Sequence, residues 1–423
     1  MPMSNAFYQE TRLPGGPLVL SHSMPEAQSV ALGIFVDIGS RDEVEGQAGM
    51  THALEHMLFK GTQCMDVDQL AEKLDELGGN ANAFTSRERT CFHLHVLHEH
   101  WQEALAVLTD MVRIPALPED EWEREREVIY AEMAMVDDTP EEWIMDQHVE
   151  ALFPEHALGR PVLGTHESLA GITAASLRDY LKKHYSDGNL LIAAAGRIRH
   201  DELVAALADY SWPVTGGAKE RSQPGAPVQG LQALERDGEQ AQMVLSFPGI
   251  TVTSDERPLA WLANQVLGGG MSSRLFREVR EKRGLAYGVG SHLSMLTDTG
   301  VWSVTCGSEP ERAAECAVVL QQVLDDFADT LKEDEVERAK RQLEVQFRMG
   351  LDSVEGQMLY LGGRLDEESL YSPQQWLEQI RAVDVEMVRQ WARARLAEGA
   401  LWSIAAPKEV LASVCEKIGG NRH

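Results

Sequence analysis

Three side chains that could hold a metal ion and move a proton lie close together near residue 54. They are His52, Glu55 and His56. If this segment is helical, His52 and His56 lie one turn apart on the same face, with Glu55 beside them. Two neutral imidazoles at this spacing suit Zn²⁺, and a neighbouring carboxylate could take a proton from an attacking water. Two histidines and a glutamate also occur on helices by chance, so the rest of the sequence must decide.

A third metal ligand is predicted from a second helix. Residues 119–136 form a strongly charged helical segment that follows Pro118. Glu132 lies in a mostly apolar stretch of this segment, where a carboxylate needs a cation, and it would complete a His₂Glu zinc site with one position open for water. Glu125 lies two turns earlier on the same stripe. It either orients one of the two histidines as a hydrogen-bond acceptor or is a plain surface carboxylate.

A rival metal site is suggested by the densest group of histidines, which comprises His93, His95, His98 and His100. His93 and His95 would share one face of a strand over residues 91–97, but the nearest carboxylate, Glu99, joins that face only if the strand continues further. We interpret these histidines as solvated or as lying at the edge of a core.

Length and charge limit the class of protein. A chain of 423 residues is too long for one ordinary core, so two or more domains are expected. The formal net charge of −29 argues against a nucleic-acid partner and favours attraction of basic peptides. The alternative is that the acidic surface only maintains solubility.

The cysteine content and the hydropathy of the sequence indicate the cellular compartment in which the protein is expected. The five cysteines are scattered without C-x-x-C spacing, which indicates neither a disulfide framework nor a thiolate metal site. The N-terminus lacks a basic region followed by an apolar run, and the longest apolar stretches, such as residues 190–195, are too short to span a bilayer. We therefore expect a soluble cytoplasmic protein that does not contact a membrane.

The order of predicted elements places the motif helix between strands. Residues 30–38 read as a strand before it, and a helix over residues 66–77 follows it. Residues 80–86 then read either as an edge strand that could pair with an extended peptide or as a surface turn followed by a strand. A helix over residues 174–185 and a strand over residues 190–195 close the first half.

An internal repeat divides the chain. Residues 117–121 resemble residues 331–335 at an offset of 214, and residues 212–230 are rich in Pro and Gly. We predict an α+β fold made of two homologous α/β domains, at residues 1–211 and 231–423, joined by a linker at 212–230. The repeat sets non-ligating residues against the metal motif: Trp261, Asn264 and Gln265 against His52, Glu55 and His56, and Gln346 and Ala339 against Glu132 and Glu125. Restriction of the motif to one half favours chemistry over a structural role.

A glycine-rich loop in the second half carries little functional information. Gly268, Gly269 and Gly270 precede a predicted helix, which is an arrangement that can bind phosphate. The loop lacks both the G-K-[ST] ending of a P-loop and the spacing of a dinucleotide-binding motif. We therefore expect a flexible loop.

Taken together, these motifs resemble the pitrilysin or insulinase-like zinc metallopeptidases (inverzincins), in particular the short branch that includes mitochondrial processing peptidase and its bacterial relatives. The resemblance spans almost the whole chain. It is carried by H-x-x-E-H at residues 52–56, by Glu132 at 76 residues after His56, by residues 79–90, and by Arg280 with Tyr287.

The resemblance implies a clam-shell of two domains around a chamber, with one Zn²⁺ per chain held by His52, His56 and Glu132. It implies that Glu55 is the general base, and that Arg280 and Tyr287 hold the substrate backbone or stabilise the oxyanion. It also implies that extended substrate pairs with the segment Asn82, Ala83, Phe84 and Thr85. The expected activity is zinc-dependent endopeptidase action on extended or unfolded peptides, in a homodimer or a heterodimer with a related subunit. The alternative is a non-catalytic peptide-binding subunit of a heterodimeric peptidase.

Overall fold

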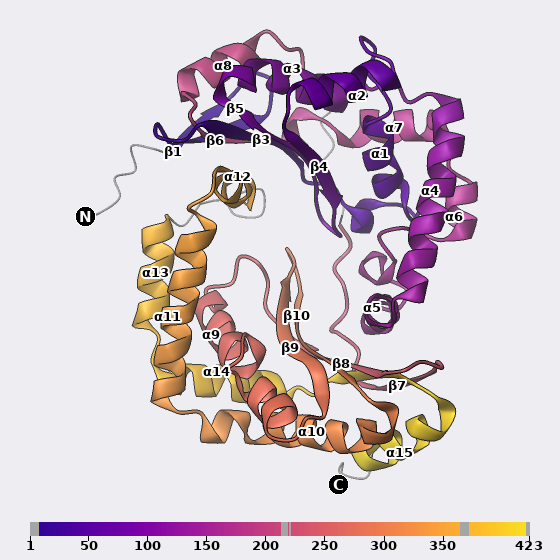
Figure 1. Cartoon of the computed structure of the whole chain (residues 1–423), viewed down its shortest axis with the longest axis vertical. Helices are drawn as coiled ribbons and strands as arrows, with labels where there is room; N and C mark the ends of the chain where they lie inside the picture. The colour runs from indigo at the N-terminus through magenta and orange to yellow at the C-terminus, as the bar shows by residue number, and fades with distance from the viewer. Residues whose placement is uncertain (1–7, 213–218, 220, 364–371, 420–423) are drawn as a thin grey trace. The chain divides into compact units, whose positions relative to one another are not determined.

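A computed structural model of the chain describes residues 8–212, 219, 221–363 and 372–419, and shows two sheets with helices packed on them (Figure 1). The strands are β1 (Tyr8–Arg12), β2 (Leu18–Ser23), β3 (Ser29–Val36), β4 (Asn80–Thr85), β5 (Thr90–Leu97), β6 (Leu190–Gly196), β7 (Gly230–Glu235), β8 (Ala241–Pro248), β9 (Ala286–Met295), β10 (Gly300–Ser308) and β11 (Leu401–Ala406).

The helices are α-helices and short segments of 3₁₀ or π geometry. The α-helices are α1 (Met50–Leu58), α2 (Val67–Glu76), α3 (Trp101–Arg113), α4 (Glu119–Asp138), α5 (Pro140–Leu152), α6 (His166–Ala170), α7 (Ala174–His184), α8 (His200–Ala208), α9 (Arg257–Gly268), α10 (Ala313–Thr330), α11 (Glu333–Gly350), α12 (Val354–Gly362), α13 (Pro373–Ala382), α14 (Val385–Ala397) and α15 (Lys408–Gly419). The 3₁₀ segments are η2 (Ser40–Asp42), η3 (His98–His100), η4 (Ala157–Gly159), η5 (Asp187–Asn189) and η7 (Pro310–Arg312), and η6 (Phe276–Glu281) is a π-helix.

The two sheets share one topology. The first has the order β1-β2-β6-β3-β5-β4, and the second has the order β7-β11-β8-β10-β9. Without β1, the orders match strand for strand, and each sheet contains a single parallel pair, β2 with β6 and β7 with β11, among antiparallel pairs. The long helices α4 and α11 begin 214 residues apart, which is the offset predicted from the sequence. The prediction of two homologous α/β units is confirmed.

The compact units are discontinuous along the chain. The first comprises residues 1–134, 160–222 and 347–370, and the second comprises residues 135–159, 223–346 and 371–423. Helix α12, from the second half of the sequence, therefore belongs with the first sheet, and α5, from the first half, belongs with the second sheet. The predicted division at 212–230 did not include this exchange of helices. Residues 213–218 and 220 of that segment lie outside the part that the structure describes.

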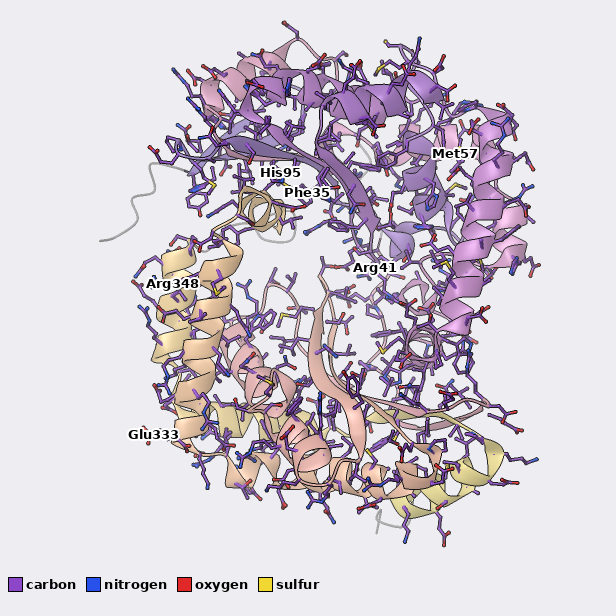
Figure 2. All side chains as sticks on the ribbon, viewed as in Figure 1. Phe35, Arg41, Met57, His95, Glu333 and Arg348 are labelled. Atoms are coloured by element: carbon purple, nitrogen blue, oxygen red, sulfur yellow. The ribbon has the colours of Figure 1, made fainter. Side chains whose placement is uncertain are left out.

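Each exchanged helix covers one face of its sheet. Met358 of α12 is fully buried in a cluster with Phe35 of β3, and Figure 2 shows Phe35 on the side of the sheet where α12 lies. A Cβ atom at Gly33 would lie 2.5 Å from Sδ of Met358, so glycine lets the helix approach the strand closely. In the second unit, Ile144 of α5 packs on Val244 of β8.

The opposite face of the first sheet carries its largest core and positions the motif helix. Leu54 and Met57 of α1 are fully buried there, together with Phe92 of β5 and Trp122 of α4. Among the described residues, the strand β4 pairs only with β5 and forms the edge of the sheet, as the edge-strand reading of residues 80–86 predicted. The core therefore fixes α1, α4 and the edge strand in one unit.

Candidate metal centre

The N-terminus of α1 is anchored by a buried carboxylate. The backbone N–H groups of Gly49 and Thr51 donate to the two carboxylate oxygens of Glu43, at 3.0 and 2.8 Å. Gly49 has a φ of 88°, and a Cβ there would lie 2.6 Å from the Leu163 carbonyl oxygen, so this position requires glycine. Burial raises the pKa of Glu43 to about 7, although these hydrogen bonds favour its charged form. The anchor sets where α1 starts, and hence where its histidines point.

The predicted ligands come together in the first unit. The Nε2 atoms of His52 and His56 lie 3.7 and 3.6 Å from Oε2 of Glu132, and ligand atoms from all three residues lie within 4.8 Å of one another. These separations are too long for good hydrogen bonds. They are close to the roughly 3.3 Å expected between two ligands that each lie about 2.0 Å from a tetrahedral zinc ion. The donor set therefore fits Zn²⁺ in both chemistry and spacing.

The electrostatics favour the metal-binding forms of His52 and Glu132, whereas His56 is shifted toward its protonated form, which a bound metal ion would have to displace. Burial and the adjacent His56 lower the pKa of His52 to about 4, which keeps its imidazole neutral. Burial also acts to lower the pKa of His56, but the carboxylates of Glu132 and Glu125 outweigh it and raise that pKa. The neighbouring His56 lowers the pKa of Glu132 and holds it ionised. A neutral imidazole and an ionised carboxylate are the ligand forms that coordinate zinc.

The orientation of His56 is fixed by Glu125. The Nδ1 atom of His56 lies 3.0 Å from Oε2 of Glu125, and Nζ of Lys60 lies 2.6 Å from the other carboxylate oxygen. Glu125 is 7% exposed, so it is not a plain surface carboxylate. With Nδ1 donating to Glu125, the lone pair on Nε2 of His56 faces Glu132. The corresponding Nδ1 of His52 is buried and has no hydrogen-bond partner among the described residues.

Glu55 lies between the ligands and the edge strand. Its Oε2 atom accepts a hydrogen bond from the hydroxyl of Thr85 at the end of β4. Burial raises the pKa of Glu55, and the bond from Thr85 partly offsets this rise. The charges of His56 and Glu132 also act on Glu55, so the carboxylate lies in the field of the ligand group. A carboxylate with a raised pKa is suited to accept a proton near neutral pH.

The edge strand presents its side chains alternately. Asn82 and Phe84 are exposed, whereas Ala83 packs against the core and Thr85 reaches Glu55. The outer backbone edge of β4 has no partner strand in the described part of the chain. The geometry leaves this edge available to an extended peptide, and the substrate contacts predicted for these four residues stay a prediction.

Arg280 and Tyr287 lie in the second unit. Arg280 is in η6, and its guanidinium stacks over the Tyr287 ring at 4.8 Å and over the Phe276 ring at 4.7 Å. The Tyr287 side chain, near the start of β9, is 81% exposed. Their predicted contact with substrate at the metal centre stays a prediction.

The histidines of β5 form no second centre in the described part of the chain. Nδ1 of His93 lies 3.5 Å from Glu355 of α12, and Nε2 of His95 lies 2.9 Å from the Ser29 hydroxyl. Of the residues that the structure describes, only His52, His56 and Glu132 are grouped closely enough to hold a metal ion. Interpretation of the histidine cluster as core-edge residues agrees with this placement.

The second unit repeats the helix pair without the ligands. Gln265 of α9 donates from Nε2 to Oε1 of Gln342 of α11 at 3.2 Å, and Asn264 accepts from the indole N–H of Trp302. Neutral amides thus stand at the positions that the repeat sets against Glu55 and His56, and each has a hydrogen-bond partner within the second unit. Glu43 and Lys60 were missed by sequence reasoning, because their partners lie several residues away or on another helix and no local pattern signals them.

Comparisons with known proteins identify the family of the chain. Residues 18–166 match the family model described as insulinase (peptidase family M16), and residues 171–343 match the model described as the peptidase M16 inactive domain. An uncharacterized zinc protease of Streptomyces coelicolor is 35% identical, over 94% of this chain and 89% of its own length. One of Bacillus subtilis is 34% identical, over 93% and 96%. The chain belongs to the M16 family of peptidases.

Solved structures show the same fold. A Pseudomonas fluorescens structure described as a peptidase M16 inactive domain superposes with a TM-score of 0.87 and 24% identity, covering 95% of this chain and 98% of the other. A protease from Helicobacter pylori gives 0.88 and 19%, covering 95% and 99%. In the described part of this chain, no helix is both long and apolar enough to cross a bilayer.

Proposed function

We propose that this chain is a zinc-dependent endopeptidase that hydrolyses peptide bonds in extended peptides or unfolded segments, in the manner of a processing peptidase. The observation that carries the proposal is the convergence of ligand atoms from His52, His56 and Glu132 within 4.8 Å of one another. The relatives named as zinc proteases support it. One zinc ion per chain, held by these three residues, leaves one position for water.

Each residue around the metal has a separate role in the proposed hydrolysis. Bound Zn²⁺ acts as a Lewis acid and lowers the pKa of water from about 15.7 toward about 7. Glu55 accepts the proton that the attacking water loses and later returns it to the leaving amine. Thr85 holds one oxygen of Glu55, so the other is free to meet the water. Glu125 keeps His56 in the correct tautomer and orientation.

Substrate selection is proposed to begin at the edge of the first sheet. The free edge of β4, over Asn82 to Thr85, can pair with the backbone of an extended peptide. Because Thr85 contacts Glu55, a peptide paired there would run past the general base. The formal charge of −29 favours basic peptides. We further propose that the protein acts in the cytoplasm as a homodimer or with a related subunit.

The test is metal content and cleavage of a quenched peptide by the purified protein. We expect about one zinc per chain, loss of cleavage with a chelator, and recovery when zinc is added back. A non-catalytic peptide-binding subunit would bind the peptide without zinc-dependent cleavage. Zinc-free protein with full activity would contradict the proposal.

A further inference from the structure

The start of α1 is fixed by a carboxylate that lies outside the metal group. Glu43 follows η2 in the loop before α1, and the residue is 4% exposed. Its two carboxylate oxygens accept from the N–H groups of Gly49 and Thr51, at the point where a helix leaves its N–H groups without intrahelical partners. Gly49, the N-cap residue, has no side chain that could cap the helix. Glu43 therefore takes the place of an N-cap side chain.

The cap matters more to His52 than to His56. His52 follows Thr51 directly and lies in the first turn of α1, whereas His56 lies in the last turn. Helix ends fray when their N–H groups lose their partners, so a weakened cap would first displace the first turn. Glu125 orients the ring of His56, but Nδ1 of His52 is buried and has no hydrogen-bond partner among the described residues. The direction of the His52 ring thus depends on the backbone that Glu43 holds.

Several further contacts hold the loop and the helix start in the same place. Nη2 of Arg160 donates to the backbone carbonyl of Glu43 at 2.6 Å. The hydroxyl of Ser168 in α6 donates to the carbonyl of Ala48 at 2.7 Å, just before the helix begins. These contacts all lie in the first unit, so the support of the helix start belongs to the same body as the metal group.

The charge on Glu43 is not explained by the stability of the fold. Burial raises the pKa of Glu43 from its ordinary value of 4.5 to about 7, although the bonds from Thr51 and Gly49 and the charge of Arg160 act to lower it. Because the unfolded chain loses this proton more readily, the free energy of unfolding decreases as the pH rises from about 4.5 to 7. A neutral side chain would cost the fold less. Strongly shifted carboxyl groups are typical of functional sites.

We infer that Glu43 is a positioning residue for the metal: its ionised carboxylate fixes the start of α1 so that His52 is aimed at zinc, and protonation of Glu43 weakens this hold. The inference rests on the zinc site of the proposed function and adds proton control of its metal affinity. From neighbouring elements, Glu43 faces the charge of Arg160 and the phenol of Tyr180 in α7, which lies 2.8 Å from the Thr51 hydroxyl. Burial and the charge of Glu43 raise the pKa of Tyr180, so the phenol stays neutral.

The direction of the pH effect follows from the hydrogen bonds. An ionised carboxylate accepts from both N–H groups, whereas a protonated carboxyl has given one oxygen a proton and serves one N–H less well. The ionised form therefore holds the helix start more firmly. Since the pKa of Glu43 is about 7, the part of the zinc affinity that Glu43 supports is present at pH 8 and lost toward pH 6.

The test compares the zinc affinities of wild type and Glu43→Gln between pH 8 and pH 6, measured by competition with a chromogenic chelator. The amide keeps the size of the side chain but cannot accept from both N–H groups. We expect Glu43→Gln to bind zinc roughly tenfold more weakly at pH 8 and only about twofold more weakly at pH 6, where wild-type Glu43 is mostly protonated. Taking the ratio of the two proteins at each pH removes the titration of His56, which they share.

The matched control is Glu45→Gln, which removes the charge of an exposed carboxylate two residues further along the loop. It should bind zinc like wild type at both pH values. A ratio between Glu43→Gln and wild type that is the same at pH 8 and pH 6 would indicate a plain structural loss and would overturn the inference. Equal affinities of the two proteins would overturn it as well.

A second variant keeps the inference testable if Glu43→Gln does not fold. Arg160→Gln retains a donor for the Glu43 carbonyl but removes a charge that lowers the pKa of Glu43. Its zinc affinity should begin to fall at a higher pH than that of wild type, and an unchanged pH dependence would contradict the inference. If wild type binds zinc but cleaves no peptide, the peptidase proposal fails and the zinc comparison still decides the role of Glu43. Wild type that binds no zinc would overturn both.

Discussion

Glu125 fixes the orientation of the His56 imidazole: Nδ1 of the ring lies 3.0 Å from Oε2 of Glu125, which is a buried residue. Lys60 pairs with the other oxygen of Glu125 and holds that carboxylate in place. The Nδ1 atom of His56 thereby fixes the orientation of the ring, and the Nε2 atom faces His52 and Glu132. The metal affinity and the turnover of the site depend on this arrangement.

Loss of the Glu125 carboxylate should weaken zinc binding. Glu125→Ala removes the acceptor that fixes the His56 tautomer, and such losses typically cost 10- to 100-fold in metal affinity. Competition with a chromogenic chelator measures this affinity. Glu127→Ala, an exposed glutamate on the same helix, is the matched control and should leave it unchanged. Equal affinities for the two variants would remove Glu125 from the support of the site.

Glu55→Gln should separate metal binding from catalysis. The amide keeps the size of the side chain but cannot accept the proton, so kcat should fall about 10²- to 10⁴-fold. Zinc content should stay at the wild-type level, since Glu55 is not among the three grouped ligands. Elemental analysis and peptide cleavage on the same sample measure both quantities. Full turnover by this variant would show that another group takes the proton.

The Thr85 hydroxyl should contribute to turnover through the orientation of Glu55. Thr85→Val removes the bond to Glu55 and keeps the shape of the side chain, so we expect kcat to fall roughly 10- to 100-fold. Thr85→Ser retains a hydroxyl and should recover most of the activity. Steady-state kinetics of the two variants give the comparison. If Val and Ser behave alike, the hydroxyl does not position the base.

His148 should make the second unit less stable in mild acid. Its two ring nitrogens lie 2.7 Å from the hydroxyls of Ser246 and Ser403, and burial lowers its pKa to about 4. Because the unfolded chain takes up the proton near pH 6.5, the free energy of unfolding should fall as the pH drops from about 6.5 to 4, by about 3 kcal/mol in all.

Chemical denaturation of wild type and His148→Gln between pH 7 and 4 measures this dependence. The amide can keep one or both hydrogen bonds but does not titrate, so the variant should lose less stability over this interval. The same pH dependence in both proteins would assign the effect to other groups.

The metal group could be predicted from sequence because its signals are local. The spacing of His52 and His56 places them on one helical face, and Glu132 stands out as a carboxylate in an apolar stretch. Glu43 and Lys60 could not be recognised in this way, because their roles arise only when the chain folds back on itself. The sequence also did not predict that α5 packs on the second sheet and α12 on the first. The apolar face of a helix shows that the helix packs on a sheet, but it does not show which of two similar sheets that is.

The most direct test of the account is the position of zinc in a crystal, measured by anomalous scattering at the zinc absorption edge. We predict one strong peak per chain, about 2.0 to 2.2 Å from Nε2 of His52, Nε2 of His56 and a carboxylate oxygen of Glu132. A peak coordinated by other residues, or no peak in crystals grown with zinc, would contradict the central claim.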